Sequence, residues 1–558
     1  MSQTGSDLFL EALEQYGVRK LFGNPGTTEL PIVHSLSESD IEYVLGLHED
    51  IAVGMAAGYA STRRHHADGN DDALPLGVVN LHVAPGLAHG LGNVHGAQFA
   101  GAPLLVTAGN YGTGFQHEEP ILHGDVERMA RQFTKWSAEV KDVGALPTMV
   151  RRAVRVALTP PTGPVFLGLP ADVMSAETAA TPERLGSIPD AGDGDPEQID
   201  AAATAIVEAD DPVFVYGDAI ARAGTDAVES ATRLAEESGA RVYGEYITSE
   251  VNVPTDHEQW ISSFSGSAEA VAEEIGDADV ILLAGRSTDT DSFERDADRI
   301  PRDAELVHVS DDAWQVGKNE PADVAVIGDP GRVLGSIADR VSELVDDAER
   351  ARRLDRVRAA GARNDSSAGN VDPGDGRATK TQLARALDAV LDDALVVNEA
   401  VTSSLALRQE RAFGPNEYLS NKSGGLGYGL PAAVGAALAE EEAGGERTVV
   451  GFIGDGSYLY YPQTIYSARR YDVDLTVVVA NNSNYRILKD NTIRMLGGSE
   501  DDYDFPGMDF DPAVDFTANA GSHGAVAHRV DSPTEIEPTL REAVTTDGPV
   551  VVDVAIKD

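Results

Sequence analysis

The stretch RTVVGFIGDGS, residues 447–457, predicts a buried β-strand that ends in a Gly-Asp-Gly turn. An apolar run without polar alternation is typical of a strand that is covered on both faces. The next such run, LTVVVANN at 475–482, follows after one helix-like segment. A strand–helix–strand unit places both strands parallel in one sheet, so Asp455 and Asn482 should meet at its carboxyl edge.

Asp455 and Asn482 would offer a carboxylate and an amide oxygen at that edge. Hard cations such as Mg²⁺ prefer these ligands and take their remaining oxygens from water and phosphates. Gly454 and Gly456 would let a phosphorylated ligand approach the backbone, and the helix after Ser457 would offer N–H groups. The turn alone could equally be a helix cap. The pairing of the two motifs favours a metal and diphosphate site.

Strand-like and helix-like segments alternate along the rest of the 558 residues. This alternation predicts an α/β protein with three doubly wound parallel-sheet domains. An acidic stretch after about residue 182 and a Gly-, Asn- and Ser-rich stretch before residue 375 are typical of linkers. The expected domains are therefore N-terminal (1–182), central (195–345) and C-terminal (375–558).

The composition excludes several classes of protein. The 92 acidic residues outnumber 43 Lys and Arg, which gives a net charge of −49 without a basic stripe for nucleic acid. No apolar run reaches the roughly 18 residues of a membrane helix, and no signal-peptide pattern opens the chain. We therefore expect a soluble, cytoplasmic protein with no membrane or nucleic-acid partner. Because salt screens such a charge, we favour a high-salt cytosol over a merely acidic protein.

The GDGS motif followed by the Asn-Asn pair resembles the cofactor-binding pattern of thiamine-diphosphate-dependent 2-oxo acid decarboxylases, carboligases and acetolactate synthases. The resemblance implies thiamine diphosphate and Mg²⁺ as cofactors, a pyrimidine-binding N-terminal domain and a diphosphate-binding C-terminal domain. It implies Asp455, Asn482 and Asn484 as metal ligands, the last through its backbone carbonyl. The other implied cofactor-binding residues are Val401, Thr402, Gly425, Leu426, Gly454, Gly456, Ser457, Tyr485 and Ile487.

Glu49 follows an apolar strand and begins a helix rich in Ala and Gly, where close packing would shield a carboxyl group from water. An acidic residue there could also simply complement the helix N-terminus. By the resemblance, Glu49 is the catalytic group that protonates the cofactor's aminopyrimidine ring. The resemblance also implies a homodimer or homotetramer, with each active site between the N-terminal domain of one subunit and the C-terminal domain of another.

Four strings are similar to the benzoylformate decarboxylase branch of this family: LFGNPGTTELP, VVNLHVAPG, NEAVTSS and SGGLGYGLPAAVG. This similarity implies decarboxylation of a small-molecule 2-oxo acid, with Thr27, Glu29 and His82 as catalytic residues. An imidazole at His82 could exchange protons near neutral pH, although a lone His at a strand end is usually structural. Ser292 stands near the place of that branch's second catalytic His, which counts against an aromatic substrate.

Other interpretations stay open. After the decarboxylase, the second interpretation is an acetolactate synthase-type carboligase that joins two 2-oxo acids. His82 counts against it, because those enzymes usually have a small or hydroxyl residue at this place. A catalytically degenerate homologue is the third, and the intact set of Glu49, Asp455 and Asn482 counts against it. A nicotinamide or flavin oxidoreductase would need a strand-linked GxGxxG motif, and none stands out. Family analogy allows FAD or a nucleotide in the central domain, but no residue supports it.

Overall fold

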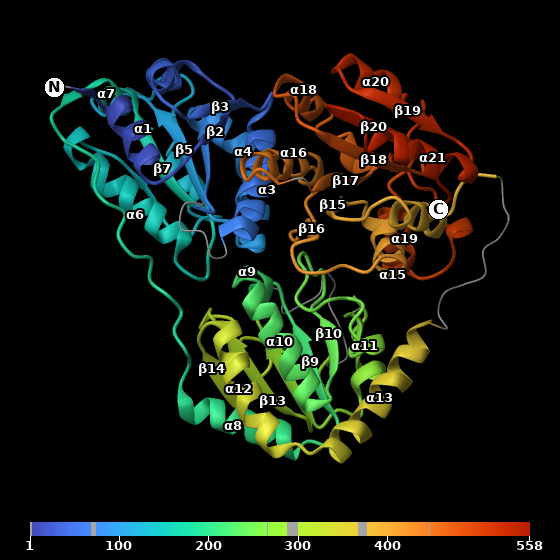
Figure 1. Cartoon of the computed structure of the whole chain (residues 1–558). Helices are drawn as coiled ribbons and strands as arrows, with labels where there is room; N and C mark the ends of the chain where they lie inside the picture. The colour runs from blue at the N-terminus through green and yellow to red at the C-terminus, as the bar shows by residue number, and fades with distance from the viewer. Residues whose placement is uncertain (1–2, 68–73, 265, 287–298, 366–375, 446) are drawn as a thin grey trace.

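A computed structural model describes residues 3–67, 74–264, 266–286, 299–365, 376–445 and 447–558. Within these ranges the chain forms three six-stranded sheets, all parallel, and one short two-stranded sheet. The N-terminal and C-terminal domains lie side by side, and the central domain lies against both (Figure 1). The predicted fold of three α/β domains is confirmed. No helix in the described ranges is long and apolar enough to cross a bilayer.

The N-terminal sheet has the strand order β3-β2-β4-β5-β7-β6. Its strands are β2 (Lys20–Gly23), β3 (Glu42–Leu45), β4 (Gly77–Leu81), β5 (Leu104–Asn110), β6 (Ser137–Glu139) and β7 (Val165–Pro170). Its helices are α1 (Gly5–Gln15), α2 (Leu30–Ser35), α3 (Glu49–Ala67), α4 (Val83–Ala100), α5 (Val126–Ala130), α6 (Leu146–Leu158) and α7 (Ala171–Ser175). The antiparallel pair β1 (Gln3–Thr4) and β8 (Glu177–Thr178) joins the two ends of the domain. The strand order reverses between β2 and β4, where loops diverge and ligands commonly bind.

The central sheet has the strand order β11-β10-β9-β12-β13-β14. Its strands are β9 (Pro212–Tyr216), β10 (Arg241–Gly244), β11 (Trp260–Ser263), β12 (Val280–Ala284), β13 (Glu305–Ser310) and β14 (Val324–Ile327). Its helices are α8 (Pro196–Glu208), α9 (Ala219–Arg222), α10 (Thr225–Ser238), α11 (Ala268–Ile275), α12 (Pro330–Leu344) and α13 (Asp347–Asp365).

The C-terminal sheet has the strand order β16-β15-β17-β18-β20-β19. Its strands are β15 (Ala394–Glu399), β16 (Tyr418–Ser420), β17 (Thr448–Gly454), β18 (Leu475–Asn481), β19 (Val526–Val530) and β20 (Pro549–Ala555). Its helices are α14 (Lys380–Asp388), α15 (Ser404–Glu410), α16 (Gly429–Glu442), α17 (Asp455–Tyr458), α18 (Thr464–Arg470), α19 (Arg486–Leu496), α20 (Phe516–Ser522) and α21 (Pro533–Ala543). Strands β17 and β18 are parallel neighbours, with Gly454 opposite Ala480, as the opening motif predicts.

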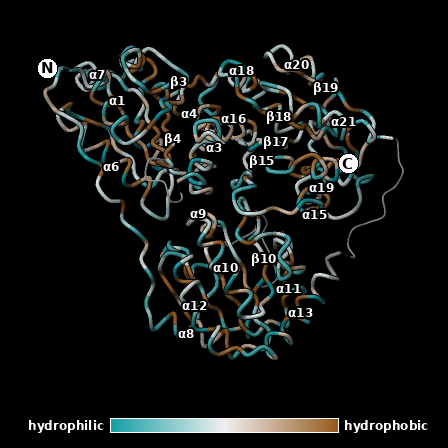
Figure 2. The backbone as a smooth tube through the Cα atoms, viewed as in Figure 1, coloured by the Kyte–Doolittle hydropathy of each residue, from teal (hydrophilic) through white to brown (hydrophobic). Residues whose placement is uncertain are grey.

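Short 3₁₀ turns complete the described elements: η1 (Thr27–Glu29), η2 (Leu36–Glu38), η3 (Gln116–Glu118), η4 (Val143–Ala145), η5 (Val401–Ser403) and η6 (Glu500–Asp502). Figure 2 shows brown, hydrophobic segments along the interior strands of the domains, where apolar burial drives folding. One continuous cluster of buried apolar side chains includes residues of both the N-terminal and the C-terminal sheets. These two domains therefore share a core.

Helices α3 and α16 form the centre of that shared core and lie against each other (Figure 1). A methyl group at Gly435 of α16 would overlap the backbone carbonyl of Met55, and one at Gly58 of α3 would overlap that of Ala432. The backbones of the two helices therefore touch directly. Glu49 begins one helix and the loop that carries Leu426 precedes the other, so this contact holds two predicted site segments in place.

A buried charge cluster joins the central domain to the C-terminal domain. The ammonium group of Lys422 lies 2.6 Å from Asp218 and 2.7 Å from Glu245, and all three side chains are fully buried. Arg64 of α3 also pairs with Glu250 of the central domain. A buried charge is tolerated only when it is paired in this way, so removing one partner would be costly.

We predict that Gly435→Ala destabilises the protein by about 1–3 kcal/mol, because the added methyl group forces α3 and α16 apart. Gly521→Ala in α20 is the matched control, since its added methyl group meets open space. The control should be neutral or slightly stabilising, as alanine favours a helix over glycine. Urea unfolding followed by circular dichroism measures both variants. Equal unfolding midpoints would contradict the direct backbone contact.

Candidate active site

The carboxyl ends of β15, β17 and β18 open on a pocket in the C-terminal domain. Asp455 begins α17 immediately after β17, and Asn482 follows β18 directly. The predicted residues that line this pocket are Val401, Thr402, Leu426, Gly454, Asp455, Gly456, Ser457, Asn482, Asn484, Tyr485 and Ile487. Gly425, the neighbour of Leu426, lies outside the lining. The pattern in the sequence thus selects residues that the fold brings together.

The polar groups at the bottom of this pocket fit a hard cation. Asp455 accepts hydrogen bonds from the backbone N–H of Gly456 (2.8 Å) and Ser483 (2.6 Å), and burial raises its pKa to about 7. Asn482 donates through Nδ2 to Asp558, so its Oδ1 is the atom left for a ligand. The buried Oδ1 of Asn484 has no hydrogen-bond partner among the described residues. A bound divalent cation would favour the charged carboxylate and take up amide oxygens of this kind, and the resemblance implies the backbone carbonyl of Asn484 as its third protein ligand.

Glu399, at the end of β15, is a pocket residue that sequence reasoning missed. Its buried carboxylate accepts hydrogen bonds from the backbone N–H of Gly427 (3.2 Å) and Gly429 (3.0 Å) and from the side chain of Asn421 (2.6 Å). Burial raises its pKa above the ordinary range. Because these contacts fix the loop that carries Leu426, Glu399 shapes one wall of the pocket. An acidic residue ending an apolar strand was the available signal.

In the N-terminal domain, Glu29 and His82 form a hydrogen-bonded pair at the reversal between β2 and β4. Oε2 of Glu29 lies 2.7 Å from Nδ1 of His82, and Glu29 is only 1% exposed. The backbone N–H of Gly109 donates to the other oxygen of Glu29 at 3.0 Å. The imidazole lies against Gly26, where any larger residue would overlap the ring. These contacts orient His82 and leave its Nε2 for chemistry.

Thr28, rather than its neighbour Thr27, contacts this pair. The hydroxyl of Thr28 donates to Oε1 of Glu29 at 2.6 Å and lies 3.3 Å from Nδ1 of His82. Thr27 is exposed in the chain. The role of Thr27 remains a prediction from the resemblance. Thr28 is a further residue that sequence reasoning missed, since the local pattern gives no signal about its contact with His82. Ser292, the other residue that bears on the substrate, lies outside the described residues.

Glu49 is buried at the start of α3. It lies next to two histidines, His48 and His89, that sequence reasoning missed. Its Oε2 lies 3.1 Å from Nδ1 of His89, and its Oε1 lies 3.4 Å from Nδ2 of Asn24. The ring of His48 stacks on that of His89 at a centroid distance of 5.1 Å. Glu49 does not line the C-terminal pocket of its own chain.

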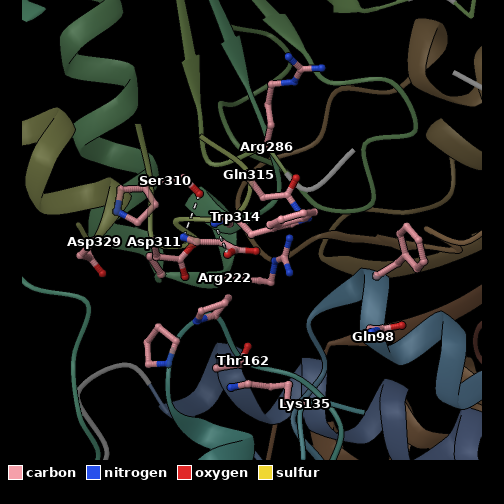
Figure 3. Close-up of a pocket in the computed structure, with 17 residues that line it drawn as sticks. Gln98, Lys135, Thr162, Arg222, Arg286, Ser310, Asp311, Trp314, Gln315 and Asp329 are labelled. Carbon is pink, nitrogen blue, oxygen red and sulfur yellow. Dashed lines mark hydrogen bonds between the residues drawn. The ribbon is translucent and has the colours of Figure 1, made fainter. Parts of the chain in front are cut away.

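A second cavity, of about 420 Å³, lies between the N-terminal and central domains (Figure 3). Lys135, Arg222 and Trp314 line it together with Asp311. Burial lowers the pKa of Lys135 to about 8. The lining includes none of the predicted site residues, so the C-terminal pocket, the Glu29–His82 pair and the surroundings of Glu49 remain the candidate active site.

Comparisons with known proteins agree with this geometry. Three family models match: the thiamine pyrophosphate enzyme N-terminal TPP binding domain at residues 3–134, the central domain at 199–337 and the C-terminal TPP binding domain at 401–554. The chain belongs to the thiamine-diphosphate-dependent enzyme family of decarboxylases and carboligases. The predicted family is therefore confirmed.

Individual relatives extend over nearly the whole chain. Benzoylformate decarboxylase of Pseudomonas aeruginosa is 29% identical to this chain, and the aligned region covers 98% of this chain and 97% of the relative's chain. Acetolactate synthase of Bacillus subtilis is 26% identical and covers 99% and 93%. The crystal structure of benzoylformate decarboxylase from Polynucleobacter necessarius superposes with a TM-score of 0.87 at 26% identity, covering 100% and 99%.

We predict that Asp50→Asn reduces the loss of stability as the pH rises from about 4 to 6. Burial raises the pKa of Asp50 to about 6, so the native chain retains a proton that the unfolded chain has already released. The stabilisation is complete below about pH 4 and is lost as the pH rises through 6, and the asparagine cannot ionise. The wild type should lose on the order of 2 kcal/mol more than the variant across this window.

Chemical unfolding at several pH values measures the effect, with the exposed Asp501→Asn as control. An asparagine keeps an oxygen that accepts from the backbone N–H of Asn93, and its amide nitrogen can donate to the Tyr461 hydroxyl in place of the bond that this hydroxyl now donates, so the variant should fold. If the free energy of unfolding changes with pH by the same amount in the wild type and in Asp50→Asn, the pKa of Asp50 is not raised.

Proposed function

We propose that the protein is a thiamine-diphosphate- and Mg²⁺-dependent lyase that decarboxylates a small 2-oxo acid, in the manner of the benzoylformate decarboxylases. The observation that carries the proposal is the Glu29–His82 pair, a buried carboxylate 2.7 Å from an imidazole. Such a pair presents a proton donor of fixed orientation. The similarity to named benzoylformate decarboxylases over the full chain supports it.

In this proposal the C-terminal pocket holds the cofactor's diphosphate through Mg²⁺. Asp455, Asn482 and Asn484 would ligate the cation, and the Gly454-Asp455-Gly456 turn and Ser457 would lie against the phosphates. When bound, thiamine diphosphate supplies the electron sink that accepts the electrons released with CO₂. The buried Glu49 would hold a proton on the pyrimidine ring.

His82 would deliver the proton that completes the aldehyde product. Because Glu29 engages Nδ1, the proton would leave from Nε2, and the carboxylate would stabilise the imidazolium form before transfer. Thr28 would hold both partners in position.

An acetolactate synthase-type carboligase is the second candidate function, and the full-length similarity to acetolactate synthases favours it. In that case the active site would add a second 2-oxo acid instead of a proton. A cofactor-binding homologue without turnover is the third candidate. The products formed from a 2-oxo acid separate all three.

We also propose a homodimer or homotetramer in which each active site combines Glu49 of one subunit with the C-terminal pocket of another. The absence of Glu49 from the pocket lining of its own chain supports this arrangement. The net charge of −49 supports work in a high-salt cytosol, where ions screen the repulsion between carboxylates.

We predict cofactor-dependent decarboxylation by the purified protein in concentrated salt, with Mg²⁺ and thiamine diphosphate. Pyruvate, branched-chain 2-oxo acids and benzoylformate are the test substrates, and aldehyde and ketol products are both assayed. Glu49→Gln and Asp455→Asn should each lower kcat/KM by at least about 10²-fold, because each removes a group that acts on the cofactor. Ketol as the main product would favour the carboligase, and no turnover of any substrate would contradict both enzymes.

We predict that co-expression of Glu49→Gln chains with Asp455→Asn chains restores activity. In a mixed dimer, one of the two sites would combine an intact Glu49 with an intact Asp455, so about a quarter of the wild-type sites should be active. Each variant expressed alone is the control. Activity no higher than that of the single variants would place both residues of one site in the same chain.

A further inference from the structure

Three polar side chains lie together at the start of α3: His48, Glu49 and His89. Their potential ligand atoms all lie within 4.8 Å of one another. Glu49 has a role in the proposed function, but the two histidines do not. Nδ1 of His89 lies 3.1 Å from Oε2 of Glu49, the carboxylate that gains and loses a proton in the proposed function.

The hydrogen bonds of His48 argue against a metal ion in this cluster. Nδ1 of His48 accepts the backbone N–H of Asp50 at 3.1 Å, so the neutral ring carries its proton on Nε2. Burial is the main reason that the pKa of His48 is lowered, and this favours the neutral ring. The ring therefore has no lone pair free for a cation. Instead it stacks on His89 and holds that ring in place.

His89 has the opposite environment. Its Nδ1 faces Oε2 of Glu49, while its side chain is 57% exposed, against 9% for the side chain of Glu49. In the single chain, the imidazole thus contacts the buried carboxylate through Nδ1, and more than half of its side chain is open to solvent. A side chain that contacts both environments can carry a proton between them.

We propose that His89 is the positioning and proton-exchange residue for Glu49, through which this carboxylate equilibrates its proton with water. The inference rests on the proposed function, in which Glu49 exchanges a proton with the cofactor. His89 takes a proton from a hydronium ion of the solvent at Nε2, which leaves a water molecule and an imidazolium ion. It then gives the Nδ1 proton to Oε2 of Glu49, which leaves a neutral imidazole and a neutral carboxyl group. The reverse transfer returns the proton to water.

The other ionisable groups near this pair include Tyr43 of β3, whose pKa burial raises above its ordinary value, Asp50 of α3 and Tyr461 of the C-terminal domain. Asp50 accepts a hydrogen bond from Tyr461 at 2.9 Å, and the Tyr461 ring lies 5.2 Å from that of His48. Asp50 is buried, and its two carboxylate oxygens accept hydrogen bonds from the backbone N–H of Asn93 and the hydroxyl of Tyr461, so it does not connect Glu49 with water. Of the described residues near Glu49, His89 is therefore the one suited to the exchange.

The test is the exchange of the C2 proton of thiamine diphosphate in the holoenzyme. The protein with Mg²⁺ and cofactor is mixed with D₂O, quenched with acid and analysed by NMR. His89→Asn is the informative variant, because its amide can still donate to Glu49 but cannot carry a proton. His95→Asn is the matched control: His95 lies on the same helix and contacts Phe99 and Phe133 instead.

We expect exchange in His89→Asn to be slower by on the order of 10²-fold, with His95→Asn at the wild-type rate. Cofactor affinity, measured by calorimetry, should stay within about twofold of wild type, since the positioning hydrogen bond is kept. In His89→Ala, added imidazole should restore part of the exchange rate.

The outcomes separate this inference from the proposed function. Slow exchange in Glu49→Gln together with wild-type exchange in His89→Asn would overturn the role of His89 alone. Wild-type exchange in Glu49→Gln, or no cofactor binding by the wild type, would overturn the proposed function itself. If exchange is slow in His89→Asn and added imidazole does not restore it in His89→Ala, His89 only supports the structure and does not carry the proton.

Discussion

The direct backbone contact between α3 and α16 is the constraint on which the rest of the structure depends. Because Gly58 and Gly435 lack side chains, the helices approach more closely than any other residue would allow. The N-terminal and C-terminal sheets therefore share one core. The same contact fixes where α3 begins, at Glu49, and where the loop with Leu426 ends. The positions of the candidate site residues thus depend on a contact made by two glycines, which have no functional side chain.

The candidate site contains several buried carboxylates near strand ends, and each of them contacts a different partner. Glu29 orients an imidazole, Glu399 holds a loop through backbone N–H groups, and Asp455 stands in a pocket of oxygen ligands. Glu49 differs because an exposed histidine contacts it. Each carboxylate lies at the carboxyl edge of a parallel sheet or at the start of the following helix, where the fold leaves polar groups room to converge. Their separate partners explain how one functional group, the carboxylate, can serve four roles.

The sequence predicted the three-domain architecture because apolar strands and amphipathic helices leave clear periodicities. It also predicted the pocket, since Asp455 and Asn482 end neighbouring strands. Contacts between distant segments were not predictable in the same way. Neither the inward turn of Thr28 beside His82 nor the approach of His89 to Glu49 follows from local pattern, because each depends on how β2, β3 and β4 are placed in the sheet. Glu399 was missed because its hydrogen-bond donors, two backbone N–H groups and the side chain of Asn421, come from a loop that follows it by more than twenty residues.

The proposed function requires this chain to bind thiamine diphosphate through a divalent cation held at Asp455. Calorimetric titration of the purified protein with thiamine diphosphate, with and without Mg²⁺, tests it most directly. We expect saturable binding that requires Mg²⁺, is lost in Asp455→Ala and survives in Glu49→Gln. Binding that is absent from the wild type, or that persists unchanged in Asp455→Ala or without a divalent cation, would contradict it.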